Sequence, residues 1–282
     1  MTTTPIATSP TVTSTASSTA APFEPEHHSN AVRDSLLLGG RAIRESLRTP
    51  DSLFPTIFIP LFFLVVNVGQ AARIFPTGST PFLKGQNYGA FQLPSSLLLS
   101  ASFGGAALYL VEEIVGGYFD KLRATPISRM SLVLGRLYAE FLRTLAVAAL
   151  MVGLSLLFGV HVESGILGFI VLIVMVATWA MVFSGFIQLI ALKSRSAAAT
   201  QGAGMIFFPL LFVAPGFVPR DQLTRPMEIA ATFNPVTYIM EAARSLILDG
   251  FDWPVLAKGF AVIGVTMALM LALSVKMVNN YD

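Results

Sequence analysis

Six long apolar stretches run through this chain, and they limit its fold more than any other feature of the sequence. A helix needs about 20 mostly apolar residues to cross the hydrocarbon core of a bilayer. The stretches cover residues 53–69, 93–111, 137–158, 166–192, 197–215 and 255–275. Charged residues make up 12% of the chain, whereas a soluble domain carries about 25%. We therefore predict an all-α polytopic membrane protein with six transmembrane helices.

The N-terminal 50 residues have no such stretch and divide into two parts. Residues 1–28 are rich in Ser, Thr, Ala and Pro, a composition that buries too little apolar surface to fold. We interpret them as a disordered cytoplasmic tail, and the sequence leaves a regulatory role open. Residues 29–50 carry apolar side chains on one helical stripe and arginines mainly off it, namely Val32, Leu36, Ile43 and Leu47 against Arg33, Arg41, Arg44 and Arg48. This pattern predicts an amphipathic interfacial helix, acting either as a plain anchor or as a partner-binding element, ahead of a six-helix transmembrane domain over 51–282.

The distribution of Lys and Arg predicts how the chain is oriented in the membrane. Cytoplasmic loops carry an excess of these residues. With six spans both termini lie on one side, and twelve of the 18 Lys and Arg residues fall on that side. We therefore expect the N- and C-termini to be cytoplasmic.

A short polar segment, residues 119–130, separates the second and third stretches. Its apolar residues Leu122 and Ile127 stand among charged ones, and Pro126 divides it into two parts. Two interpretations stay open on these residues alone: a solvated positive loop, or an element that docks into a cleft of a cytoplasmic protein. The adjoining pair Glu112 and Glu113 indicates either boundary ion pairs or a proton relay.

A second informative segment, residues 217–253, precedes the last stretch. After Pro235 the sequence predicts an amphipathic helix to about Leu248, which is too short and too charged to be a seventh span. Glu241 and Arg244 stand at i,i+3, a spacing at which they could pair. We predict short outer re-entrant or surface helices that cap the outer mouth of the bundle.

Two motifs in these segments resemble a known family. The first is Leu122-Arg123-Ala124-Thr125-Pro126-Ile127-Ser128-Arg129, followed by a Gly-Arg pair at 135–136. The second is Asn234-Pro235-Val236-Thr237-Tyr238, followed by Ala242-Ala243-Arg244. From about residue 30 onward, the chain resembles the type-2 permeases of ATP-binding-cassette exporters, especially bacterial daunorubicin-resistance-type drug and lipid efflux permeases. It departs from the family pattern in its Glu112-Glu113 pair and in the double glycine at 116–117.

The resemblance implies a mechanism and its partners. The segment from 120 to 136 would be a coupling helix seated in a separate ATPase subunit, with contacts from Asp120, Leu122, Arg123, Thr125, Pro126, Ile127, Ser128 and Arg129. An outer gate would be formed by Asn234, Pro235, Tyr238, Glu241 and Arg244. The sequence has no Gly-x-x-x-x-Gly-Lys-[Ser/Thr] phosphate loop, so ATP and Mg would be bound by the partner. The chain would pair with a second copy or a sister permease in a bacterial plasma membrane, with the first, second and fifth spans lining the path.

The substrate is inferred from side-chain type and from the resemblance. We expect a hydrophobic substrate along a path lined by Phe58, Phe62, Asn67, Phe103, Phe207 and Phe208; the alternative is that these side chains face membrane lipids or pack the bundle. A polysaccharide or lipid-linked glycan exporter of the same family, a proton-coupled secondary transporter and a non-transporting scaffold remain as other hypotheses. With no cysteine and no ligand-like spacing of its three histidines, the chain is expected to hold no metal, cofactor or catalytic site, and no nucleic-acid partner is expected.

Overall fold

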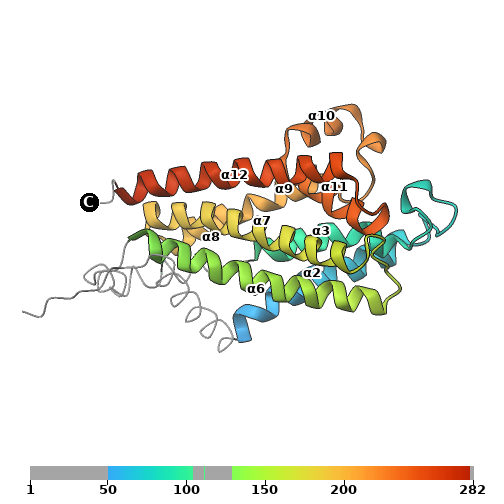
Figure 1. The fold of residues 1–282 in the computed structure, drawn as a ribbon, viewed down its shortest axis with the longest axis horizontal. Helices are drawn as coiled ribbons and strands as arrows, with labels where there is room; N and C mark the ends of the chain where they lie inside the picture. The colour runs from blue at the N-terminus through green and yellow to red at the C-terminus, as the bar shows by residue number, and fades with distance from the viewer. Residues whose placement is uncertain (1–49, 104–110, 112–128, 280–282) are drawn as a thin grey trace, which may run out of the picture.

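A computed structural model describes residues 50–103, 111 and 129–279 (Figure 1). Every regular element in these ranges is a helix. Four of them are long and apolar enough to cross a membrane, over Phe54–Ala71, Leu134–Leu157, Gly165–Ser194 and Trp253–Met277. These spans lie in α2 (Pro50–Ala71), α6 (Arg129–Leu157), α7 (Gly165–Ser194) and α12 (Trp253–Asn279). The prediction of a helical, multi-pass chain is confirmed for this part, and the four helices match the first, third, fourth and sixth predicted spans.

The second and fifth predicted spans contain shorter helices. α3 (Tyr88–Ser102) has 15 residues, and the residues 104–110 that follow it lie outside the described part of the chain. The fifth span is divided at Ile206 into α8 (Ala197–Met205) and α9 (Phe207–Val213). Pro209 has no N–H to donate to the carbonyl of Met205, so a continuous helix would lack one bond at this junction. The total of six spans therefore stays a prediction.

α3 lies at the centre of the helix bundle. It packs against α2, α6, α7 and α11 (Pro235–Leu248), and every residue from Tyr88 to Ala101 is buried. The Asn87 side chain caps its start by accepting the Ala90 N–H at 3.1 Å. Burying a polar side chain on such a helix costs free energy unless the side chain is hydrogen-bonded. The polar residues of α3 therefore need hydrogen-bond partners.

Two glycines allow α12 to pack closely on its neighbours. A Cβ built on Gly185 of α7 would lie 2.4 Å from the sulfur of Met270. A Cβ on Gly259 of α12 would lie 2.5 Å from the Cβ of Ala242 in α11. Small residues of this kind let the backbones of membrane helices approach each other, and here they hold α7 and α11 against the last helix.

The long helices run between two ends of the molecule (Figure 1). We call one the loop end, where residues 72–87, 158–164, 215–233 and 245–252 gather. It includes the short helices η1 (Pro81–Leu83), η2 (Arg220–Gln222) and α10 (Arg225–Phe233). We call the other the basal end, where α6 begins, α7 turns into α8, and α12 finishes.

Candidate functional site

The second sequence motif forms the start of α11, as predicted. The Oδ1 of Asn234 accepts the Val236 N–H at 3.0 Å, and its Nδ2 donates to the carbonyl of Leu210 at 2.5 Å. Pro235 occupies the first turn of the helix, where its missing N–H costs nothing. Asn234 therefore caps α11 and also ties it to α9, next to the break in the fifth predicted span.

Glu241 pairs with a different arginine from the one at i,i+3. Its carboxylate accepts two bonds from Arg220 in η2, from Nε at 2.9 Å and from Nη2 at 2.6 Å. The Arg220 guanidinium also lies 5.0 Å from the ring centroid of Tyr238, whose hydroxyl donates to the carbonyl of Thr232 at 2.8 Å. The pair with Arg244 that the i,i+3 spacing allows is therefore not formed, since the bidentate geometry of Arg220 fits both carboxylate oxygens.

Arg244 instead points into the bundle. Its Nη2 donates to the carbonyl of Pro215 at 2.9 Å and its Nε to the carbonyl of Phe91 in α3 at 3.3 Å. Its Cζ lies 3.6 Å from the centroid of the Phe91 ring. Burial lowers the pKa of Arg244 to about 10, and the nearby carboxylate of Glu241 opposes this shift. The side chain is therefore a buried cation at neutral pH, held by carbonyls and a ring.

Two further side chains close the loop end. Tyr88 donates its hydroxyl to the carbonyl of Phe217 at 2.8 Å. Gln86 donates from Nε2 to the carbonyl of Ile247 at 2.9 Å and accepts the His161 N–H on Oε1 at 3.0 Å. The sequence analysis did not single out Gln86, since a bond to a distant backbone carbonyl leaves no spacing pattern. Together these bonds join α3, α11 and three loops into one cap.

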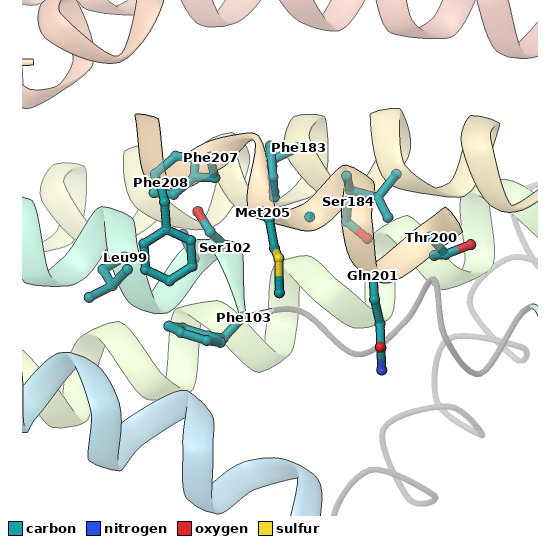
Figure 2. A pocket seen from close by; sticks show the side chains of 13 residues that line it. Leu99, Ser102, Phe103, Phe183, Ser184, Thr200, Gln201, Met205, Phe207 and Phe208 are labelled. Carbon is teal, nitrogen blue, oxygen red and sulfur yellow. The ribbon is translucent and has the colours of Figure 1, made fainter. Parts of the chain in front are cut away.

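A cavity of about 440 Å³ lies beside the broken helix, towards the basal end (Figure 2). α3, α7, α8 and α9 contribute its walls, and four phenylalanines line it: Phe103, Phe183, Phe207 and Phe208. The rings pack in two pairs, Phe183 with Phe207 at 5.2 Å and Phe103 with Phe208 at 6.1 Å between centroids. The polar lining is Ser102, Ser184, Thr200 and Gln201. No charged residue is among the described residues that line it.

The predicted path residues divide into two groups. Phe103, Phe207 and Phe208 meet in this cavity. Phe58 and Phe62 lie outside it on α2, 49% and 58% exposed, stacked at 5.9 Å between centroids. Asn67 also lies outside it and donates to the carbonyl of Phe63 at 2.7 Å.

The predicted coupling segment falls almost wholly outside the described residues. This applies to Asp120 through Ser128, to the acidic pair Glu112 and Glu113, and to the N-terminal tail and amphipathic helix over 1–49. Arg129 is the first residue of α6. The described chain resumes at this residue, at the basal end (Figure 1).

An ion pair inside α6 was not singled out from the sequence. Glu140 is 2% exposed, and Arg143 pairs with its Oε1 through Nη2 and with its Oε2 through Nε at 3.3 Å. Thr144 also donates to Oε1 at 3.3 Å. The i,i+3 spacing of opposite charges inside an apolar stretch is the signal that could have found it. Ionisable residues within spans are a functional hypothesis by default.

The described helices define a multi-pass membrane protein. Residues 35–248 match the family model described as ABC-2 type transporter, and the chain belongs to this family. It is thus a permease of an ABC-2 transporter, and permeases of ABC transporters pair with ATPase subunits. Among the described residues, no group of three or more His, Cys, Asp or Glu could hold a metal ion.

Curated relatives are similar to this chain at low identity. The probable doxorubicin resistance ABC transporter permease protein DrrC of Mycobacterium tuberculosis (strain ATCC 25618 / H37Rv) is 21% identical over 254 residues, which covers 89% of this chain and 88% of the relative. The daunorubicin resistance ABC transporter permease protein DrrB1 of Streptomyces coeruleorubidus is 24% identical over 212 residues, or 73% of this chain and 72% of the relative. The resemblance inferred from the two motifs is confirmed.

Proposed function

We propose that this permease moves a lipophilic drug or a lipid-like molecule outward across a bacterial plasma membrane. The observation that carries the proposal is the cavity beside the broken helix. Its volume of about 440 Å³ falls in the range of about 300–1,000 Å³ that is usual for drug-sized ligands. The names of the relatives, which refer to doxorubicin and daunorubicin resistance, support the same substrate class.

The chemistry of the lining favours a lipophile over a sugar. Four phenylalanine rings offer apolar and stacking surface, and four neutral side chains offer a few hydrogen bonds. A glycan would need a lining dense in hydrogen-bonding groups, since each hydroxyl that loses water without a partner carries a free-energy cost. The glycan exporter therefore stays the second choice within the family.

The energy for transport would come from a separate ATPase subunit that binds ATP and Mg. The coupling segment from Asp120 to Arg129 would sit in a groove of that subunit, and its movement would reach the bundle through α6, which begins at Arg129. With this arrangement the basal end and both termini would face the cytoplasm. The loop end, with the outer gate formed by Asn234, Pro235, Tyr238, Glu241 and Arg244, would then face outward.

A second permease copy or a sister permease would cover the exposed aromatic face of α2. Phe54, Phe58 and Phe62 stack along this face at four-residue spacing, and all three are exposed. The neighbouring α8–α9 break exposes further apolar side chains, among them Met205 and Phe212. Membrane lipids would cover the remaining apolar surface.

Transport into sealed vesicles tests this function. The chain and its ATPase subunit are reconstituted together, and uptake of doxorubicin is followed with and without ATP. Uptake should require both ATP and the ATPase subunit, and Phe207→Ala should reduce it several-fold because Phe207 is a buried wall of the cavity. Phe260→Ala, at an exposed position on α12, is the matched control and should leave uptake unchanged. Uptake driven by a proton gradient without the ATPase subunit would overturn the proposal.

The coupling role of the polar segment is tested separately. Arg123→Ala and Pro126→Ala should lower ATP-driven uptake. The permease and its ATPase subunit should also co-purify less well in these variants than in the unaltered pair. Normal uptake and normal stimulation of ATPase activity by doxorubicin in both variants would contradict the coupling role. The cavity assignment would stand in that case, since it depends on different residues.

A further inference from the structure

Four buried polar atoms of α3 have no hydrogen-bond partner within the described chain. They are Nε2 and Oε1 of Gln92, Oγ of Ser96 and Oγ of Ser100. The exposed fractions of these three residues are 0%, 0% and 1%. Buried polar groups without partners are strongly unfavourable, so something other than the described protein groups should satisfy them.

Other hydroxyls in the helices behave differently. Ser102 donates to the carbonyl of Leu98 at 2.9 Å, Ser155 to that of Met151 and Ser274 to that of Met270, each four residues back along its helix. This local bond is the usual way for a serine in a helix to satisfy itself. Ser96 and Ser100 do not make it, and their hydroxyls are left available to another partner.

The unpartnered groups share one face of α3 with two of the residues that line the cavity. Gln92, Ser96 and Ser100 recur every four residues, and Leu99 and Phe103 stand at i+3 and i+7 from Ser96, which is the spacing of a single helix face. Leu99 and Phe103 line the cavity. Because α3 begins at the loop end, the polar residues continue this wall from the cavity towards that end.

The opposite wall continues in the same direction. Trp179 lies one turn before Phe183 on α7, on the same face, and Phe183 lines the cavity. The Nε1 of Trp179 is also buried without a partner in the described chain. α3 and α7 pack against each other, so donors and acceptors on both helices extend from the cavity towards the loop end.

We propose that Gln92, Ser96, Ser100 and Trp179 form a polar track that holds water and receives the neutral polar groups of the substrate as it leaves the cavity outward. The inference rests on the proposed export function. Its groups are uncharged donors and acceptors, so the substrate it fits is a lipophile with hydroxyl, carbonyl or amide groups. In the described state the track is closed, because its side chains are buried.

Cysteine labelling tests the track, since the chain has no cysteine of its own. Ser96→Cys and Ser100→Cys are each prepared in the full permease with its ATPase subunit and treated with a small water-soluble methanethiosulfonate reagent. Leu98→Cys is the matched control, because Leu98 is 0% exposed on the same helix but points to the opposite face from Ser96. During ATP turnover the two serine positions should react at least about tenfold faster than Leu98→Cys, since the reagent needs an ionised, hydrated thiol. Doxorubicin should slow labelling at Ser100→Cys.

Labelling as slow as that of Leu98→Cys in every nucleotide state would overturn the track. Fast labelling that doxorubicin does not slow would overturn its assignment to the substrate. The reaction with the thiol does not need transport, so its outcome is distinct from that of the uptake assay. A variant that elutes as aggregated protein is replaced by Gln92→Cys, which is a further buried residue of the track and should likewise react faster than the control.

Discussion

The guanidinium of Arg244 lies 3.6 Å from the centroid of the Phe91 ring and donates to the carbonyl of the same residue. Arg244 belongs to α11 and Phe91 to α3, so one side chain joins the helix that caps the loop end to the helix at the centre of the bundle. Its second bond, to the carbonyl of Pro215, includes the loop that follows α9. The motif that ends in Arg244 thus fixes α11 in place, because this one cation contacts two backbone carbonyls and one aromatic ring.

Replacing Arg244 should separate the effect of its charge from that of its shape. Arg244→Lys keeps a buried charge but loses the planar fork and the stacking, whereas Arg244→Met removes the charge and keeps much of the apolar volume. We expect the lysine variant to lose about 1–3 kcal/mol of stability, more than the methionine variant, because a buried charge with fewer bonds is the costlier change. Thermal unfolding of the purified protein measures the difference.

The pKa of Arg244 gives this comparison a control. The pKa of Arg244 in the folded protein is lowered only to about 10. The free energy of unfolding therefore rises with pH through the deprotonation of Arg244 only above about pH 10, and this contribution is absent at neutral pH. The stability difference between the unaltered protein and the methionine variant, which has no titrating group at this position, should therefore be the same at pH 6 and pH 8, both well below about 10. A lysine variant as stable as the unaltered protein would contradict the assigned contacts.

The pair of Arg220 and Glu241 should matter more than a similar pair nearby. Glu241→Gln removes a bidentate pair in which both side chains are about a quarter exposed, and it should cost on the order of 1 kcal/mol. Glu228→Gln breaks the pair with Arg225, which is 78% exposed, and should cost less than about 0.5 kcal/mol. Hydrogen exchange over residues 220–223 should accelerate in the first variant, and equal acceleration in both would argue against a special role for Glu241.

The sequence predicted local features of this molecule well and tertiary contacts poorly. The apolar stretches locate four spans because length and hydropathy decide membrane insertion, and Asn234-Pro235 locates the start of α11 because capping is a local rule. The i,i+3 rule allowed a bond between Glu241 and Arg244 because it considers only one helix, whereas Arg220 reaches Glu241 through the tertiary fold. Contacts with backbone carbonyls, such as those of Gln86, have no signature in the sequence.

The lining of the cavity was also predicted only in part. Phe207 and Phe208 were expected to line a path, and from the start of α9 they line the cavity with Phe103. The aromatic face of Phe58 and Phe62 was assigned to the same path, but residue type alone cannot distinguish a cavity wall from an exposed surface. The contribution of α7 through Phe183 was missed because its stretch is apolar all round.

A double-mutant cycle should reveal the strength of the ion pair inside α6. Removing one partner leaves a charge buried without compensation, so Glu140→Gln and Arg143→Gln should each cost about 3–5 kcal/mol. The double variant should recover part of this loss, with a coupling energy of about 0.5–3 kcal/mol. Lys84 and Asp249, whose side chains are 57% and 43% exposed, are the control pair and should give a coupling energy of about 0–1 kcal/mol. Additive effects at Glu140 and Arg143 would show that the pair does not stabilise the helix bundle.

Adding one methyl group at Gly259 should destabilise the contact between α11 and α12. The new Cβ would lie 2.5 Å from the Cβ of Ala242 and 3.2 Å from the carbonyl oxygen of Tyr238, and a helix backbone cannot move aside as a flexible side chain can. We expect Gly259→Ala to lower stability by about 1–3 kcal/mol. Gly264→Ala on the same helix is the control, because no atom lies within 4 Å of the new Cβ and alanine favours the helix by up to about 1 kcal/mol. The melting temperatures of the two variants should therefore shift in opposite directions, and a loss of stability in neither would mean that α11 and α12 are not packed this closely.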